Sequence, residues 1–197
     1  MTTRRPSYFG PTKVEDCPAI IFNNSGSMAA IGRVEKSFEI IKDVGRNSSF
    51  DLYVNDARTG IPDFVAHIES IRHGTLNPPL LPLVSGEDYM NPLALAAIIQ
   101  EYNSVHIIDD GEASAFLWNA LEILDNIGFD ERRSITLYII RSQKEYRGVD
   151  NQFKWLSSKF PQAFDGTGNT EIMVYHAIPK VPHESTEWQR DRLLFIE

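Results

Sequence analysis

The sequence has one cysteine, no block of basic residues and no long apolar run. A lone Cys17 excludes a disulfide scaffold and a zinc site built from cysteines within one chain, and we interpret it as an inert thiol. The net charge of −8 and the scattered lysines and arginines argue against duplex nucleic acid as a partner. No segment approaches the roughly 18 apolar residues that a membrane helix needs, so we expect no membrane partner and a cytoplasmic protein.

The composition favours one folded domain with irregular ends. Hydrophobic residues make up 42% of the 197 residues, which is enough to build a core. We expect an N-terminal arm over residues 1–18, where prolines recur, an α/β domain over 19–176 and a C-terminal tail over 177–197. The apolar end of this tail, Leu193 to Ile196, is predicted to pack on the same chain or on a partner.

Short apolar runs alternate with amphipathic segments along the chain. The pattern predicts strands at 19–22, 50–54, 80–84, 105–108, 135–140 and 171–176. It predicts helices at 31–44, 64–71, 93–102 and 114–127, and one more that carries Phe153, Leu156 and Phe160. This alternation indicates an α/β fold in three layers, with a mostly parallel central sheet and helices on both faces. We interpret His106, inside a strand, as a core or edge histidine.

Polar turns follow two of the predicted buried strands. Ser25 and Ser27 lie two residues apart after the first strand, with Asn23 just before them, and Asp110 follows the strand at 105–108. Because open parallel sheets place their sites at the carboxyl ends of the strands, we expect these side chains to converge. Two hydroxyls and a carboxylate are oxygen ligands of the kind that Mg²⁺ prefers.

At these residues the chain resembles a von Willebrand factor A (VWA) domain, over about residues 19–176. That family begins with a strand leading into D-x-S-x-S-M, and here the stretch is Asn23-Asn24-Ser25-Gly26-Ser27-Met28. Ser25 and Ser27 match the motif, whereas Asn23 replaces its aspartate. The family's later T-D-G motif is similar to Asp109-Asp110-Gly111, with Asp110 at the metal-side position. The resemblance implies the same α/β fold and a metal-ion-dependent adhesion site.

The family also carries a threonine in a glycine-containing loop before a helix, and this chain offers two candidates for it. Thr75 follows Gly74 but precedes prolines, whereas Asp88 lies directly before the helix at 93–102, so we favour Asp88. The resemblance thus implies Mg²⁺ as the cofactor, bound by Asn23, Ser25, Ser27, Asp88 and Asp110. In the family such a metal commonly binds an acidic residue of a partner protein. Because Asn23 carries no charge, we expect Mg²⁺ to bind weakly.

The resemblance implies a non-catalytic module that binds another protein or copies of itself, and three other interpretations stay open. The stretch from Val105 to Asp110 also resembles the phosphoribosyltransferase signature, in which four apolar and two acidic residues precede a phosphate loop, although Ala115 and Leu117 depart from that loop. A purely structural subunit of a larger assembly would suit the proline-rich arm and the apolar tail. Asparagine, glycine and serine are also ordinary turn residues, and the two aspartates would equally suit the cap of a helix starting near Ser114.

Overall fold

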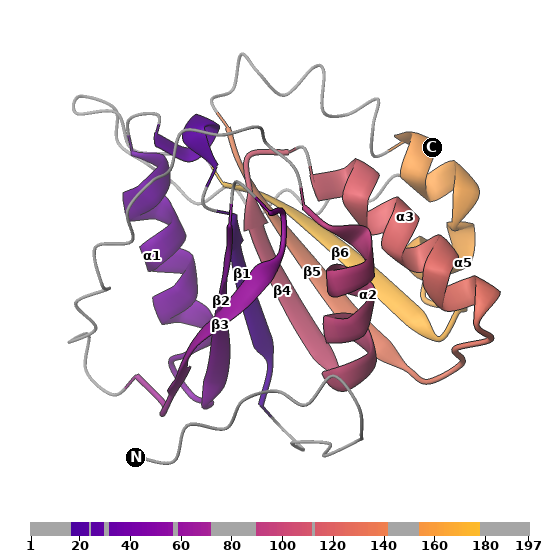
Figure 1. Cartoon of the computed structure of the whole chain (residues 1–197), viewed down its shortest axis with the longest axis horizontal. Helices are drawn as coiled ribbons and strands as arrows, with labels where there is room; N and C mark the ends of the chain where they lie inside the picture. The colour runs from indigo at the N-terminus through magenta and orange to yellow at the C-terminus, as the bar shows by residue number, and fades with distance from the viewer. Residues whose placement is uncertain are drawn as a thin grey trace.

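The described part of the chain contains a central six-stranded sheet with strand order β3-β2-β1-β4-β5-β6 (Figure 1). The computed structural model describes residues 17–23, 25–29, 32–56, 59–71, 90–111, 113–141 and 154–177. The strands are β1 (Ala19–Asn23), β2 (Phe50–Asn55), β3 (Pro62–Ile68), β4 (Ser104–Asp109), β5 (Arg133–Ile140) and β6 (Thr170–Ala177). Neighbouring strands pair in parallel, except that β3 runs antiparallel to β2. The predicted α/β class is confirmed.

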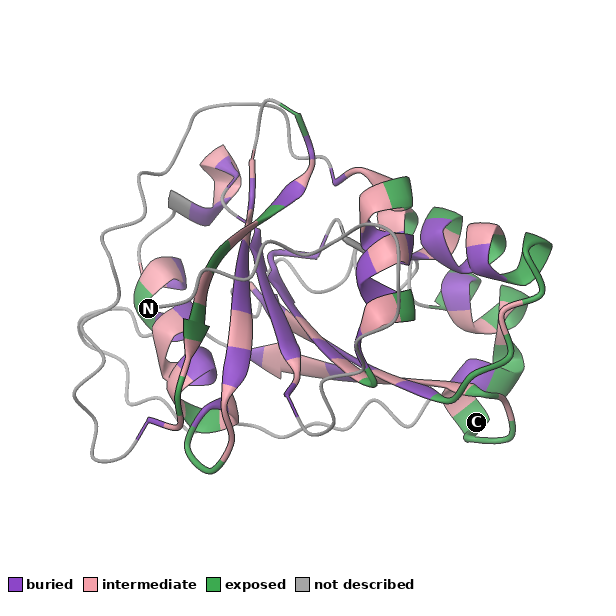
Figure 2. Cartoon of the chain, turned by 60° about the horizontal axis from the view of Figure 1, so that its bottom comes forward, coloured by how far each residue is buried: buried purple, intermediate pink, exposed green. Residues whose placement is uncertain are grey.

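Helices cover both faces of this sheet, as the alternating pattern predicted (Figure 1). They are η1 (Gly26–Ala29, a 3-10 turn), α1 (Arg33–Val44), α2 (Pro92–Glu101), α3 (Ala113–Asn126) and α5 (Pro161–Asp165), and residues 154–159 are also helical. Among the described helices, α1 and η1 pack on one face, and α2, α3, residues 154–159 and α5 pack on the other. Figure 2 shows the central strands buried between these two layers. Strands covered on both faces need the unbroken apolar runs that identified β1, β4 and β5 in the sequence.

The end of α1 depends on a close approach that only glycine permits. Gly45 caps the helix, and its amide donates to the carbonyl of Ile41 over 2.9 Å. A Cβ atom at this position would lie 2.3 Å from a ring carbon of Phe50, the first residue of β2. The backbone conformation does not require glycine here, since its φ of −80° is accessible to any residue. Glycine is required because a side chain would collide with Phe50.

The helix predicted at 64–71 is wrong, since these residues lie mostly in the antiparallel edge strand β3. Phe64 and Ile68 are four residues apart, which fits one face of a helix, but an even spacing fits one face of a strand equally well. The side chains alternate in burial along β3, with Asp63, Val65 and His67 exposed. Such a short apolar pattern could not distinguish the period of a helix from the period of a strand.

Several other predictions lie outside the described residues. These are most of the arm at 1–18, the edge strand at 80–84, Thr75, Asp88 and the tail beyond Ala177. The domain boundaries therefore stay predictions.

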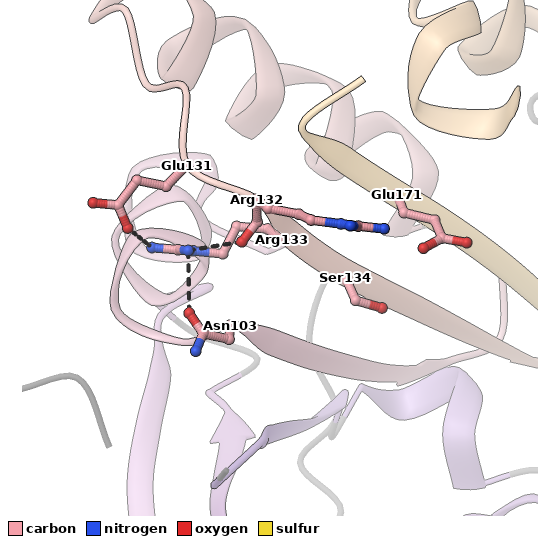
Figure 3. A pocket seen from close by; sticks show the side chains of 6 residues that line it. All are labelled: Asn103, Glu131, Arg132, Arg133, Ser134 and Glu171. Atoms are coloured by element: carbon pink, nitrogen blue, oxygen red, sulfur yellow. Dashed lines mark hydrogen bonds and ion pairs between the residues drawn. The ribbon is translucent and has the colours of Figure 1, made fainter. Parts of the chain in front are cut away.

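A buried arginine joins α2 to the start of β5, and Figure 3 shows its contacts with Asn103 and Glu131. The Arg133 guanidinium donates to the carbonyls of Ile99 and Gln100, in the last turn of α2, both over 2.9 Å. It also donates to Asn103 Oδ1 over 3.2 Å and to Glu131 Oε2 over 2.7 Å. A cation at the carboxyl end of a helix satisfies its last carbonyls and complements its dipole. Arg133 therefore fixes the end of α2 against the sheet.

His106 forms one end of an aromatic stack across β4, β5 and β6. Its ring lies 5.9 Å from that of Tyr138, which lies 5.5 Å from that of Tyr175, and both pairs are nearly parallel. The two ring nitrogens contact Tyr138 Oη and Ser104 Oγ, each at 3.3 Å. Burial lowers the pKa of His106 from 6.5 to about 4, so the ring is neutral at physiological pH.

We expect His106 to make stability depend on pH between about 6.5 and 4. In this range the unfolded chain binds a proton that the folded chain does not, so the free energy of unfolding falls as the pH is lowered. The loss should reach about 2–3 kcal/mol, and His106→Phe, which keeps an aromatic ring, should remove it. Urea unfolding of both proteins at pH 7 and pH 4.5 measures the difference. An equal loss in both proteins would assign the pH dependence to the carboxylates instead.

Candidate functional site

The candidate site lies at the carboxyl edge of the sheet, where the strand order reverses. From β1 the chain moves outward to β2 and β3, and then returns to β4 on the other side of β1. In open α/β sheets, ligands bind outside the carboxyl ends of the strands at such a switch point. The turns after β1 and β4 both lie at this point, and they carry the predicted site residues Ser25, Ser27 and Asp110.

The turn after β1 brings the two serine hydroxyls together. Ser25 is completely buried and Ser27 is half-buried, and their Oγ atoms lie 2.9 Å apart. The Met28 amide donates to the Ser25 carbonyl over 3.1 Å, which closes the 3-10 turn η1. The Met28 side chain is also completely buried, in the core under α1. Core packing therefore fixes the position of both hydroxyls.

Asn23 is occupied by partners on the neighbouring strands. Its side-chain amide nitrogen donates to Asp109 Oδ1 over 2.5 Å, and its amide oxygen accepts from Asn55 Nδ2 over 3.2 Å. Asp109 Oδ2 accepts from the Gly111 amide over 2.8 Å, in a turn where Gly111 has a φ of 114°. Asn23 thus links the ends of β2, β1 and β4.

Asp110 forms a buried ion pair with Arg33, the first residue of α1. Arg33 Nη1 donates to Asp110 Oδ2 over 2.8 Å and to the Ser27 carbonyl over 2.9 Å. The side chains of Arg33 and Asp110 are only 9% and 4% exposed. On the other side, Arg141 Nε donates to the backbone carbonyl of Asp110. One guanidinium nitrogen therefore joins the turn after β1 to the turn after β4.

Sequence reasoning missed Arg33, although the sequence holds a signal for it. A cation in the first turn of a helix is disfavoured by the helix dipole, and Arg33 occupies that turn of α1. A buried cation at this end of a helix requires an anion from elsewhere in the fold, and Asp110 supplies it. Of the five predicted metal ligands, Asn23, Ser25, Ser27 and Asp110 lie at this edge, and Asp88 lies outside the described residues.

The donor atoms fit Mg²⁺ in kind, but their charge is already balanced. Two hydroxyls and a carboxylate are suitable oxygen ligands. However, Arg33 occupies one oxygen of Asp110, and Asn23 has turned its nitrogen toward Asp109. Mg²⁺ would have to displace the guanidinium to reach that carboxylate oxygen. The residues present therefore do not form a strong Mg²⁺ site.

Comparisons with known proteins do not identify a family for this chain. No model of a known protein family matches it, and no curated protein sequence matches it either. One structural match is a Sar1-type small GTPase from Encephalitozoon cuniculi in complex with GDP. The two share 12% identity with a TM-score of 0.34, and the match covers 87% of this chain and 71% of that chain. In the described part of the chain, no helix combines the length and apolar character needed to span a membrane.

Removing the charge of Asp110 should cost substantial stability. Asp110→Asn removes a buried counter-charge of Arg33, and breaking a buried ion pair costs about 3–5 kcal/mol. Adding Arg33→Met removes the cation as well, so the double variant should be more stable than the sum of the single effects predicts. Chemical denaturation of all three variants measures this coupling.

Asp125→Asn, which changes an exposed aspartate of α3, is the control and should stay within about 0.5 kcal/mol of the parent. Strict additivity of the two buried substitutions would contradict the ion pair.

Proposed function

We propose that this chain is a non-catalytic module that binds another protein, or copies of itself, through the carboxyl edge of a VWA-like sheet. In this proposal the Arg33 guanidinium takes the electrostatic place of the Mg²⁺ ion of the VWA adhesion site. The supporting observation is the contact of Arg33 Nη1 with both the Ser27 carbonyl and Asp110 Oδ2. The motif residues thus build a rigid edge without a bound ion.

The chemistry of this edge favours binding over catalysis. A serine nucleophile needs a neighbouring base, and the hydroxyl of Ser25 contacts that of Ser27. The carboxylates of Asp109 and Asp110 accept hydrogen bonds from Asn23, Gly111 and Arg33, so both are held as structural acceptors.

The phosphoribosyltransferase alternative receives little support from the segment after β4. That interpretation requires an open loop whose backbone amides cradle a phosphate, at residues 114–117. These residues lie inside helix α3, and Leu117 is completely buried in the core. The amides of 114–116 are in the first turn of α3 and have no partner within the helix, so the enzyme is disfavoured by the buried Leu117, which cannot supply the hydroxyl of the signature.

Replacing Arg33 should convert this edge into a Mg²⁺ site. Arg33→Gln removes the competing cation and breaks its buried ion pair with Asp110, so the variant should melt lower than the parent. Millimolar Mg²⁺ should then raise the melting temperature of the variant and leave that of the parent unchanged. Arg46→Gln, which removes an exposed cation from beyond α1, is the control and should show no Mg²⁺ effect.

Asn23→Asp tests the same edge by adding a negative charge instead of removing a positive one. The new carboxylate would face Asp109, so it should destabilise the fold and raise one carboxyl pKa. Strong stabilisation of the unmodified chain by Mg²⁺ would overturn the role proposed for Arg33 and restore the metal-dependent site.

A substitution at the carboxyl edge should weaken protein association. Thr59 is exposed in the turn between β2 and β3, at this edge, and Thr59→Arg places a long charged side chain there. Asn126→Arg, at the exposed end of α3, is the matched control at the opposite edge. Sedimentation velocity and affinity capture with the full chain should show association that the first variant loses and the second keeps. Release of pyrophosphate from phosphoribosyl pyrophosphate by the chain would favour the enzyme instead.

A further inference from the structure

Three potential metal ligands converge at the amino edge of the sheet, opposite the candidate site. Cys17 precedes β1, Asp51 lies near the start of β2, and His67 lies near the end of the antiparallel strand β3. Asp51 pairs directly with His67 in the β2–β3 ladder, and the Asp51 amide donates to the Pro18 carbonyl over 3.0 Å. The strand register therefore places the three residues side by side.

The ligand atoms of these residues lie close together. Asp51 Oδ1 is 2.6 Å from His67 Nδ1, and Cys17 Sγ is 4.0 Å from the same nitrogen. All three atoms lie within 4.8 Å of one another. The cysteine and histidine side chains differ in exposure, because Cys17 is buried whereas the His67 side chain is 49% exposed.

This arrangement does not fit a cysteine nucleophile. A catalytic triad uses the two ring nitrogens of histidine for different partners, one for the nucleophile and the other for the carboxylate. Here Cys17 and Asp51 both face Nδ1. Burial, followed by the charge of Asp51, also raises the pKa of the Cys17 thiol to about 11, which disfavours a free thiolate.

Hydrogen bonds behind the cluster hold the carboxylate in place. Tyr102 Oη, just after α2, donates to Asp51 Oδ2 over 2.7 Å and lies 2.8 Å from Tyr53 Oη. Tyr102 thus engages one carboxylate oxygen and leaves the other directed at His67. Carboxylates that bind metals are characteristically oriented by such outer hydrogen bonds.

We propose that Cys17 Sγ, Asp51 Oδ1 and His67 Nδ1 form a Zn²⁺ site. Sulfur, nitrogen and carboxylate oxygen together are typical zinc ligands, and three protein ligands leave the fourth tetrahedral position to water. Bonds of about 2.3 Å to sulfur and 2.0–2.1 Å to nitrogen place those two atoms about 3.5 Å apart. The observed 4.0 Å is close to this value.

Small movements would complete the site. The nitrogen and the carboxylate oxygen, now 2.6 Å apart around a shared proton, would separate by about 0.7 Å when zinc replaces that proton. The thiol proton is released on binding. The half-exposed side of His67 leaves a path for the ion and the water.

The number of cysteines could not reveal this site. One cysteine excludes zinc sites built from several thiolates, but a single thiolate with a histidine and an aspartate is a different ligand set. These three residues are separated by 34 and 16 positions in the sequence, and only the pairing of β1, β2 and β3 brings them together. A zinc ion here would tie the edge strand β3 to the chain that leads into β1.

Metal titration of the full, reduced chain tests the proposal. We expect one Zn²⁺ per chain by calorimetry, and Co²⁺ at the same site should give a thiolate charge-transfer band and intense tetrahedral visible bands. Tyr102→Phe, which removes an outer hydrogen bond, should weaken Zn²⁺ binding about 10- to 100-fold. His67→Gln and Cys17→Ser should weaken it more, because each removes a ligand.

Asp63→Asn, which changes an exposed carboxylate of the same strand β3, is the matched control and should bind Zn²⁺ as the parent does. His67→Gln keeps the proposal falsifiable if Cys17→Ser fails to fold, since the histidine side chain is half-exposed. Absence of the thiolate band, or Zn²⁺ binding unchanged in His67→Gln, would overturn the proposal.

Discussion

The buried ion pair between Arg33 and Asp110 is the constraint on which the carboxyl edge of the sheet depends. Both side chains are almost completely removed from water, so each charge must be neutralised where it lies. The pair sets the start of α1 against the turn after β4, and the same guanidinium holds the carbonyl of Ser27. The serine turn, the aspartate turn and the first helix therefore keep their relative positions through one cation that the chain itself supplies.

The polar side chains at the two edges of the sheet differ in their hydrogen-bond partners and in their exposure to solvent. At the carboxyl edge, the side chains of Asn23 and Asp109 and one oxygen of Asp110 form hydrogen bonds with partners within the fold. At the amino edge, the carboxylate of Asp51 is supported from behind by a tyrosine while its other oxygen faces a half-exposed histidine. An edge with internally satisfied charges is a stable surface, whereas an edge with grouped ligand atoms and solvent access is suited to an ion. Both edges hold aspartates, so the residue types alone do not distinguish them. The difference lies in the hydrogen-bond partners of these aspartates and in their exposure to solvent.

The layered α/β fold could be predicted from the sequence because strands buried on both faces are apolar at successive positions. The central strands β1, β4 and β5 are mostly apolar, and the apolar residues of α1 recur at helical spacing, although its buried residues also include Arg33, Lys36 and Ser37. The edge strand β3 was predicted as a helix because Phe64 and Ile68 satisfy both periods over a short span. The motif led to Asn23, Ser25, Ser27 and Asp110, since turn residues after strands are local features. The pairing of Arg33 with Asp110 and the grouping of Cys17 with His67 could not be read locally, because the tertiary fold and the strand register bring these partners together.

The position of β1 also has a consequence for how the molecule folds. β1, the first of the described strands, lies in the interior of the sheet, where Ala19 pairs with Asp51 on one side and with Val105 on the other. The second pairing closes a loop of more than 80 residues, whose entropic cost must be met before the contact contributes stability. On a ribosome, one side of β1 stays unsatisfied until β4 has emerged. Topologies dominated by such distant parallel contacts fold slowly, so the nascent chain would expose an apolar strand for longer than a chain built from local hairpins.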